Sequence, residues 1–435
     1  MRASLIVQLL LLLSGVTKDT KVKVANGLDN GIRTPPIGWS SWYGFTTDIS
    51  EDLIVDQARG MVQSGLAEAG YEYIWIDDGW IIGRDSSGKP LEDHALFPSG
   101  MANVSAYVHS LGLKFGIYTS KGPLTCLGYQ PDQPDRPGSC GYERIDAQVY
   151  ANEWQVDAVK DDGCGDCPGR DPFAAMSKEL NETGRRVFLS IHGDKAARPE
   201  YASVANMWRV GDDLFDSSFD MWTNRLDLAT SDDQAALVGP GRIANPDFLE
   251  VGYSPIHPKG KLGIMTPLEM RSMFTMWAAL PGPLILSADL RPNAPCGGIS
   301  DASILDILTN PEIIAINQDE AVQPMRPVLR QDGTEVWRKS LADDRKVAIV
   351  FFFRGVDTTG PMPEPPEQPR SIGVSWSELG YPNNTKIAVR DLWRRNSVGI
   401  FQGNFRATVR HREALIYVFS QTPTMDEEQE RVAIA

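Results

Sequence analysis

Short and nearly continuous apolar runs alternate with longer amphipathic stretches over the first three quarters of the chain. The amphipathic segments at 50–69, 101–111 and 265–279 have the spacing of helices that bury one face. Strands that are apolar along their whole length, with helices between them, predict a parallel sheet covered by helices. The predicted strands are residues 36–42, 71–77, 113–119, 156–161, 186–192, 207–212, 242–249 and 282–288.

This succession of strand–helix units favours the α/β class and, within it, a (β/α)8 TIM barrel, which we place at residues 28–320. The rival fold is an open doubly wound sheet, which would carry a glycine-rich phosphate turn after its first strand. The residues there, Gly-Trp-Ser-Ser-Trp from Gly38 to Trp42, are not such a turn. A barrel would bring the carboxyl ends of all its strands to one site.

From about residue 321 the pattern changes to short runs that are rich in β-branched and aromatic residues and separated by turn-forming residues. This predicts a small C-terminal antiparallel β-sandwich at 321–422, followed by an acidic tail at 423–435. The proline-rich residues 361–369 are expected to form an exposed loop. The predicted strands are 336–339, 346–353, 385–389, 405–409 and 414–420.

The first residues predict entry into the secretory pathway. Met1 and Arg2 precede an apolar stretch from Leu5 to Leu13 and then small residues, which is typical of a secretory signal, placed at 1–17. No other segment reaches the ~18 consecutive apolar residues of a membrane helix. We therefore expect a secreted or lysosomal/vacuolar protein that has no membrane contact after signal removal. Three Asn-x-Ser/Thr sequons fit this route and lie at Asn103, Asn181 and Asn383.

In an oxidising compartment, five cysteines predict one or two disulfides and a leftover thiol. They are Cys126, Cys140, Cys164, Cys167 and Cys296. The CxxC spacing of Cys164 and Cys167 is also compatible with redox work or half of a zinc site. No second CxxC or paired histidine supplies the other half, so a structural role is favoured.

Charge narrows the choice of partners. The chain has 42 Lys+Arg against 57 Asp+Glu, a formal net charge of −15, which argues against nucleic acid as a partner. A small carbohydrate remains compatible with this balance, and a homodimer stays open as the state of assembly.

The fourth predicted strand ends in a basic–acidic cluster, Lys160-Asp161-Asp162. Because side chains alternate along a strand, Lys160 and Asp162 share one face while Asp161 points the other way. A carboxylate beside a lysine keeps a low pKa, so Asp162 suits a nucleophile. For Asp161 we favour a helix cap or a partner for a surface Lys or Arg.

The sixth strand is followed by a second candidate carboxylate, Asp213, four residues after Arg209. Two carboxyl groups that face each other across one site can break a glycosidic bond, and in a retaining enzyme they lie ~5–5.5 Å apart. Taken alone, Asp212-Asp213 is more often a solvated turn or a cap.

The second strand ends in Asp77-Asp78, close to Trp80. Carboxylates that accept hydrogen bonds from hydroxyls, beside an aromatic ring, are typical of sugar sites. The alternative is a Mg²⁺ or Ca²⁺ pair. Five histidines without His-x-His spacing make a zinc amidohydrolase a poor fit.

Taken together, these motifs resemble glycoside hydrolase family 27, the α-galactosidase/melibiase family. Residues 34–42 are similar to its opening "TPPMGWNSW", residues 73–80 to "YINIDDCW" and residues 156–164 to "VDYLKYDNC". The segment from Trp208 to Asp213 carries the family's W-R-x-x-x-D. The resemblance runs from about residue 34 to 420, so it covers the predicted barrel and the predicted sandwich.

The resemblance implies a retaining enzyme with Asp162 as nucleophile and Asp213 as acid/base, no metal and no organic cofactor. It implies a Cys126–Cys164 disulfide. It also implies a sugar pocket in which Asp77 and Asp78 grip the hydroxyls that distinguish galactose from glucose. The implied sugar-binding residues are Trp42, Asp77, Asp78, Tyr118, Lys160 and Arg209, to which we add His192 for the reason below.

Three positions depart from the family pattern. Asp161 replaces an aromatic residue and adds a like charge that acts to raise the pKa of Asp162. Gly79 replaces a cysteine, so another family disulfide is absent. His192 replaces the glutamate of the Cys-Glu-Trp loop that senses the sugar's 2-position. We weigh two interpretations of His192 evenly: a strand-end hydrogen-bonding residue and a sugar ligand.

The sequence thus predicts a secreted or lysosome-like exo-acting retaining α-galactosidase. The alternatives are an exo-glycosidase of the same family for another sugar, acting as α-N-acetylgalactosaminidase, β-L-arabinopyranosidase or isomalto-type hydrolase. A further alternative from another class is a catalytically silent carbohydrate-binding protein.

Overall fold

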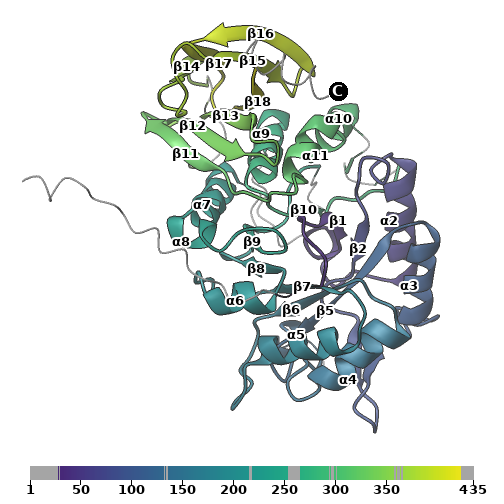
Figure 1. The fold of residues 1–435 in the computed structure, drawn as a ribbon. Helices are drawn as coiled ribbons and strands as arrows, with labels where there is room; N and C mark the ends of the chain where they lie inside the picture. The colour runs from purple at the N-terminus through teal and green to yellow at the C-terminus, as the bar shows by residue number, and fades with distance from the viewer. Residues whose placement is uncertain are drawn as a thin grey trace, which may run out of the picture.

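A computed structural model of the chain describes residues 28–422, except for 29, 132, 134–135, 215–217, 253–264, 293, 295–297, 300, 357–358, 360–362 and 364–365. The predicted secretory signal, the acidic tail and Cys296 lie outside the described residues. In Figure 1 a larger N-terminal part, purple to green, carries a smaller β-rich part at its top, green to yellow.

Within this described part, an eight-stranded parallel sheet forms the larger domain, with strand order β10-β1-β2-β5-β6-β7-β8-β9. The two ends of this order meet, because Leu249, which follows β9, pairs in parallel with Leu286 of β10. The predicted (β/α)8 barrel and each of its strands are confirmed, although most strands are shorter than predicted. The bounds are β1 Ile37–Ser40, β2 Tyr73–Trp75, β5 Lys114–Ser120, β6 Ala158–Asp162, β7 Phe188–Ile191, β8 Met207–Arg209, β9 Ile243–Asn245 and β10 Leu284–Leu286.

Helices cover the outside of the barrel (Figure 1). Their ends follow local capping chemistry: Thr266 and Glu269 form a capping box at the start of α9, and Ser50 accepts from the Leu53 amide at the start of α2. The bounds are α1 Trp42–Phe45, α2 Glu51–Gln63, α3 Met101–Ser110, α4 Glu143–Gln148, α5 Pro172–Glu182, α6 Pro199–Val204, α7 Phe219–Ala229, α8 Asp232–Ala235, α9 Pro267–Ala279, α10 Ala302–Leu308 and α11 Pro311–Asn317, with η1 Leu127–Tyr129 and η2 Val149–Glu153. No helix among these is long and apolar enough to cross a membrane.

An apolar cluster fills the amino-terminal half of the barrel interior, so polar side chains at the carboxyl ends of the strands are left to line its mouth. Gly116 on β5 makes room for Trp75, because a Cβ at this position would lie 2.7 Å from the indole ring. The cluster consists of Tyr73, Trp75, Ala158, Phe188, Met207 and Ile243.

The C-terminal part is the predicted antiparallel β-sandwich. A six-stranded sheet of order β11-β12-β13-β18-β15-β16 packs against the two-stranded sheet β14-β17 around its own apolar core. Of its strands, β11, β14 and β16 were not predicted, nor was the β3–β4 hairpin after the second barrel strand. The bounds are β3 Ile81–Arg84, β4 Pro90–Glu92, β11 Arg326–Gln331, β12 Thr334–Ser340, β13 Lys346–Phe353, β14 Arg370–Ser375, β15 Lys386–Asp391, β16 Asn396–Gln402, β17 Asn404–Val409 and β18 Ala414–Gln421.

Helix α9 joins the two parts. Arg412 of the sandwich reaches Glu269 on α9 with an Nη1–Oε1 distance of 2.8 Å, and both side chains are buried. Ser272 of α9 donates to the Arg412 carbonyl and accepts from the Ala414 amide. These polar contacts, together with an apolar core that continues from barrel to sandwich, fix the second part against the first. The boundary at residue 321 stays a prediction.

Candidate active site

Strand β6 carries the candidate nucleophile at its carboxyl end. It pairs with β5 so that Tyr118 lies opposite Lys160, and Ser120 lies opposite Asp162. The Nζ atom of Lys160 is 3.8 Å from Oδ2 of Asp162, so both side chains occupy the same face of the strand, as alternation predicts.

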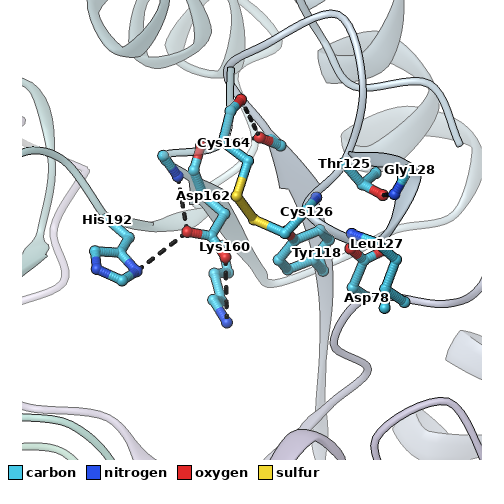
Figure 2. Close-up of a disulfide and its surroundings, with 12 residues drawn as sticks. Asp78, Tyr118, Thr125, Cys126, Leu127, Gly128, Lys160, Asp162, Cys164 and His192 are labelled. Carbon is cyan, nitrogen blue, oxygen red and sulfur yellow. Dashed lines mark hydrogen bonds and ion pairs between the residues drawn. A yellow bond between two sulfur atoms is a disulfide. The ribbon is translucent and has the colours of Figure 1, made fainter. Parts of the chain in front are cut away.

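The two oxygens of Asp162 have different surroundings. Oδ1 accepts from the Gly163 amide at 2.7 Å and lies 3.1 Å from Nδ1 of His192. Among the described residues, Oδ2 is approached only by the more distant ammonium of Lys160. Figure 2 shows the imidazole directed at one oxygen and the lysine approaching the other. Burial would raise the pKa of Asp162, but Lys160 and His192 outweigh burial, and the pKa lies well below its usual range. Asp162 is therefore a charged carboxylate with one lightly held oxygen.

Lys160 links Asp162 to the end of β2. Its ammonium donates to Oδ2 of Asp77 at 2.8 Å. Asp77 is almost fully buried from solvent. Burial alone would lower the pKa of Lys160, but Asp77 and Asp162 reverse this and raise it. The ammonium of Lys160 thus lies between the carboxylates of Asp77 and Asp162.

Asp78 serves the neighbouring loop. Its Oδ2 accepts from the Leu127 amide at 2.9 Å, and its Oδ1 accepts from the Gly79 amide at 2.8 Å. Burial raises the pKa of Asp78 to about 6. The loop that this carboxylate holds also contains Cys126, which is bonded to Cys164 after β6 (Figure 2).

Aromatic rings surround the lysine. Its Nζ lies 5.1 Å from the ring centroid of Tyr118 and 6.0 Å from that of Phe248. Trp42, at the start of α1, is partly buried against the cluster that contains Phe248. The mouth therefore combines charges with flat apolar surfaces, which is the combination that sugar rings require.

Arg209 and Asp213 form the second half of the site, beyond β8. Nη2 of Arg209 donates to Oδ1 of Asp213 at 3.0 Å and to Oδ2 of Asp247 at 2.7 Å. The Asp213 side chain is 29% exposed, whereas those of Arg209 and Asp247 are buried, so Asp213 is the carboxylate that remains accessible.

Asp247 was missed by the sequence interpretation. Besides Arg209, its Oδ2 accepts from the Leu214 amide at 2.9 Å and from the hydroxyl of Tyr43. Its backbone has a positive φ of 99°, a strained conformation that the surrounding contacts must maintain. It follows β9, which ends at Asn245, but the predicted seventh strand ran to residue 249 and so placed Asp247 inside the strand.

Electrostatics tie the two halves together. Burial acts to lower the pKa of Lys160, but Asp77, Asp162 and Asp213 together raise it. Burial acts in the same direction on Arg209. Its pKa is nevertheless raised, by Asp247, Tyr43, Asp213 and Asp162. Each cation thus interacts with both candidate carboxylates. Because β6 and β8 are parallel strands of one barrel, Asp162 and Asp213, at or just beyond their carboxyl ends, belong to the same mouth.

Two disulfides brace the loops beside the nucleophile. Cys126–Cys164, which the resemblance implied, joins the loop after β5 to the residues after β6 (Figure 2). Cys140–Cys167 is the second bridge. Because the two cysteines of the CxxC segment belong to different bridges, the redox and zinc alternatives for that segment are wrong.

The expectation for Asp161 is wrong. Its side chain is buried, and neither carboxylate oxygen has a hydrogen-bond partner among the described residues, so it neither caps a helix nor pairs with a surface cation. Burial, followed by Asp162, Glu143 and Asp146, raises the pKa of Asp161 well above its ordinary value. The like charge therefore affects Asp161 itself, whereas the pKa of Asp162 is lowered and not raised as we expected.

Asp161→Asn is expected to stabilise the protein by about 1–3 kcal/mol at pH 7, because it removes a charge that burial leaves unpartnered. The folded-state pKa of Asp161 exceeds the unfolded value, so wild-type stability falls as pH rises above ~4. The gain should consequently shrink toward pH 4. Chemical denaturation at both pH values measures it.

Asp157→Asn is the matched control, since Asp157 immediately precedes the same strand. Its carboxylate contacts His109 at 2.7 Å and Arg185 at 2.7 Å, so loss of its charge should destabilise the protein. Equal stability of wild type and Asp161→Asn at pH 7 would contradict the argument for Asp161.

His192 follows β7 and lies against the candidate nucleophile. The distance of 3.1 Å between its Nδ1 and Oδ1 of Asp162 corresponds to a hydrogen-bonding residue at a strand end, the first of the two interpretations. Contact with a sugar stays a prediction, as do the sugar-binding roles of Trp42, Asp77, Asp78, Tyr118, Lys160 and Arg209.

Comparisons with known proteins give consistent matches over both parts of the chain. Residues 34–319 match the family described as Alpha galactosidase A, and residues 331–419 match the Alpha galactosidase C-terminal beta sandwich domain. An alpha-galactosidase of Cyamopsis tetragonoloba is 33% identical over 399 residues, which cover 90% of this chain and 88% of that protein. An alpha-N-acetylgalactosaminidase of Rattus norvegicus is 34% identical over 385 residues, which cover 82% and 84%.

A solved structure agrees. The crystal structure of alpha-galactosidase I from Mortierella vinacea superposes with a TM-score of 0.74 at 27% identity, and the match covers 91% of this chain and 100% of that one.

Proposed function

We propose a function within the family to which the chain belongs, the alpha-galactosidase (melibiase) family of glycoside hydrolases. The protein is a retaining exo-α-galactosidase that removes terminal α-D-galactosyl residues from glycosides and oligosaccharides. The relatives from Cyamopsis tetragonoloba and Mortierella vinacea are named alpha-galactosidases, which supports this substrate. The observation that carries the proposal is the charged Oδ2 of Asp162, held only loosely by Lys160, at the barrel mouth to which the accessible carboxylate of Asp213 also belongs.

The reaction is a double displacement. Oδ2 of Asp162 attacks the anomeric carbon, while Asp213 gives a proton to the leaving oxygen as the glycosidic bond breaks. In the second step Asp213 takes a proton from water, whose oxygen displaces Asp162 and releases the sugar with its original configuration. Arg209, fixed by Asp247, holds Asp213 in place through both steps.

A panel of aryl glycosides tests the substrate. Hydrolysis of the aryl α-galactoside well above all the others supports the proposal. The relative named alpha-N-acetylgalactosaminidase makes the aryl α-N-acetylgalactosaminide the most informative competitor. If the enzyme prefers that substrate or a β-L-arabinopyranoside, the proposed sugar is wrong, but the proposed double displacement still holds. Binding without turnover across the panel would instead indicate a silent carbohydrate-binding protein.

We also propose passage through the secretory pathway, to the outside or to a lysosome or vacuole, with a small carbohydrate as partner. Two disulfides support an oxidising compartment. The sequon asparagines Asn103, Asn181 and Asn383 are all exposed, as glycan attachment requires. A drop in apparent mass after endoglycosidase treatment of the protein from its own cells would support this route, and an unchanged mass would count against glycosylation.

A further inference from the structure

We propose that His192 is a positioning residue for the nucleophile, which it serves by holding Oδ1 of Asp162 through its Nδ1–H. This inference rests on the proposed function and deepens it. It assigns to the two oxygens of Asp162 separate tasks: Oδ2 forms the bond to the sugar, and Oδ1 stays hydrogen-bonded throughout.

The contact is built into the backbone. The His192 amide donates to the Asp161 carbonyl at 3.2 Å, which continues the β6–β7 pairing one step past the strand. Gly163 allows the two strand ends to approach, because a Cβ there would lie 2.2 Å from the His192 carbonyl oxygen. The imidazole therefore reaches Asp162 from a fixed place.

The next loop fixes the other side of His192. A Cβ at Gly193 would lie within 2.6 Å of the Tyr201 ring, so the loop packs closely on α6. The Tyr201 hydroxyl contacts the amide of Asp194 at 3.2 Å and its carboxylate at 3.1 Å. The His192 side chain is only 16% exposed, and its Nδ1 lies 3.1 Å from Oδ1 of Asp162. Asp162 is thus the side chain that the ring engages.

The hydrogen bond acts differently in the two chemical steps. When Oδ2 bonds to the anomeric carbon, the carboxylate loses its charge and becomes an ester whose carbonyl oxygen is Oδ1. When water displaces the ester, the electrons of the breaking C–O bond return to the carboxylate, and charge develops again on Oδ1. A donor already aimed at Oδ1 stabilises this second transition state relative to the ester. His192 should therefore accelerate release of the sugar more than its capture.

Two variants separate this effect from a structural one. Asn carries an amide nitrogen close to the position of Nδ1, whereas Leu has the same branched shape without a donor. With an aryl glycoside that the wild type hydrolyses, His192→Leu should lower kcat by ~10- to 100-fold, the range of one hydrogen bond to a charged group. Its kcat/KM, which reports the first step only, should fall much less, so KM falls too. His192→Asn should recover most of the lost kcat.

The ester should also become visible. If release is slowed, His192→Leu should show a burst of phenol and a covalent sugar adduct on Asp162 by mass spectrometry of the acid-quenched protein. An equal loss of kcat and kcat/KM in the Leu variant, without recovery in the Asn variant, would overturn the proposal.

A measurement without substrate keeps this test apart from the proposed function. The chain has five histidines, so ¹⁵N-histidine labelling gives a spectrum in which the His192→Asn variant identifies the ring of His192. Its Nδ1 should be protonated, and Asp162→Asn should shift its resonance. A ring that is unaffected by Asp162→Asn would overturn the inference, whatever sugar the protein hydrolyses. Failure of the whole aryl glycoside panel would refute the proposed activity alone.

Discussion

Replacing Asp162 by Asn is expected to reduce turnover of an aryl α-galactoside by ~10⁴-fold or more, the scale of loss when a covalent nucleophile is removed. The amide keeps the shape of the side chain, but it lacks the negative charge that attacks the anomeric carbon. Lys160 and His192 stabilise this charge in the resting protein, and Lys160 lies no closer than 3.8 Å to the attacking oxygen Oδ2. Steady-state kinetics at pH 5 and pH 7 measure the loss.

The neighbouring acid provides the control. Asp161 lies one residue earlier on the same strand, but its side chain is buried on the opposite face. Asp161→Asn should leave kcat within a few-fold of wild type, although it changes stability. Undiminished turnover in Asp162→Asn would remove this residue from the mechanism, and equal losses in both variants would mean that the strand end is disturbed as a whole.

The barrel strands could be predicted because each is buried along its length, so apolar composition alone marks them. β13, with the sequence KVAIVFFF, was placed correctly for the same reason. Three sandwich strands could not be found in this way. β11 and β16 lie at the two edges of the six-stranded sheet, where one side of the strand has no neighbour, and their residues are mostly exposed. Each pairs with the strand beside it in the sequence, β11 with β12 and β16 with β15, and has no strand on its other side.

In the site, too, properties of a single strand could be predicted, whereas contacts between strands could not. Alternation along β6 places Lys160 and Asp162 on one face, because this property belongs to a single strand. The partner of His192 depends on how β6 and β7 are staggered, and the role of Asp247 depends on where β9 ends relative to β8. Asp161 was misjudged because an acid beside a strand end is usually solvated. Here the side chain is buried, and Glu143 and Asp146 of α4 help to raise its pKa.

Asp213→Asn is expected to lower turnover by an amount that depends on the leaving group, because this residue acts as acid in one step and as base in the next. For an alkyl or sugar leaving group, loss of the proton donor should cost ~10²- to 10⁴-fold. For a dinitrophenyl galactoside, which departs without protonation, the first step should be nearly normal and only release should slow. Steady-state and burst kinetics over a series of aryl galactosides measure this dependence.

Addition of azide to the same assay tests whether Asp213 acts as the base in the second step. It is an anion that needs no base, so it should capture the galactosyl group from Asp162 in the variant and restore turnover, giving a galactosyl azide of retained configuration. Asp212→Asn is the control, since the Asp212 side chain is 71% exposed and pairs with Lys195 away from Arg209. A loss in Asp213→Asn that is the same for every leaving group and is not relieved by azide would show that the carboxylate held by Arg209 only shapes the site. The acid/base would then have to be another group.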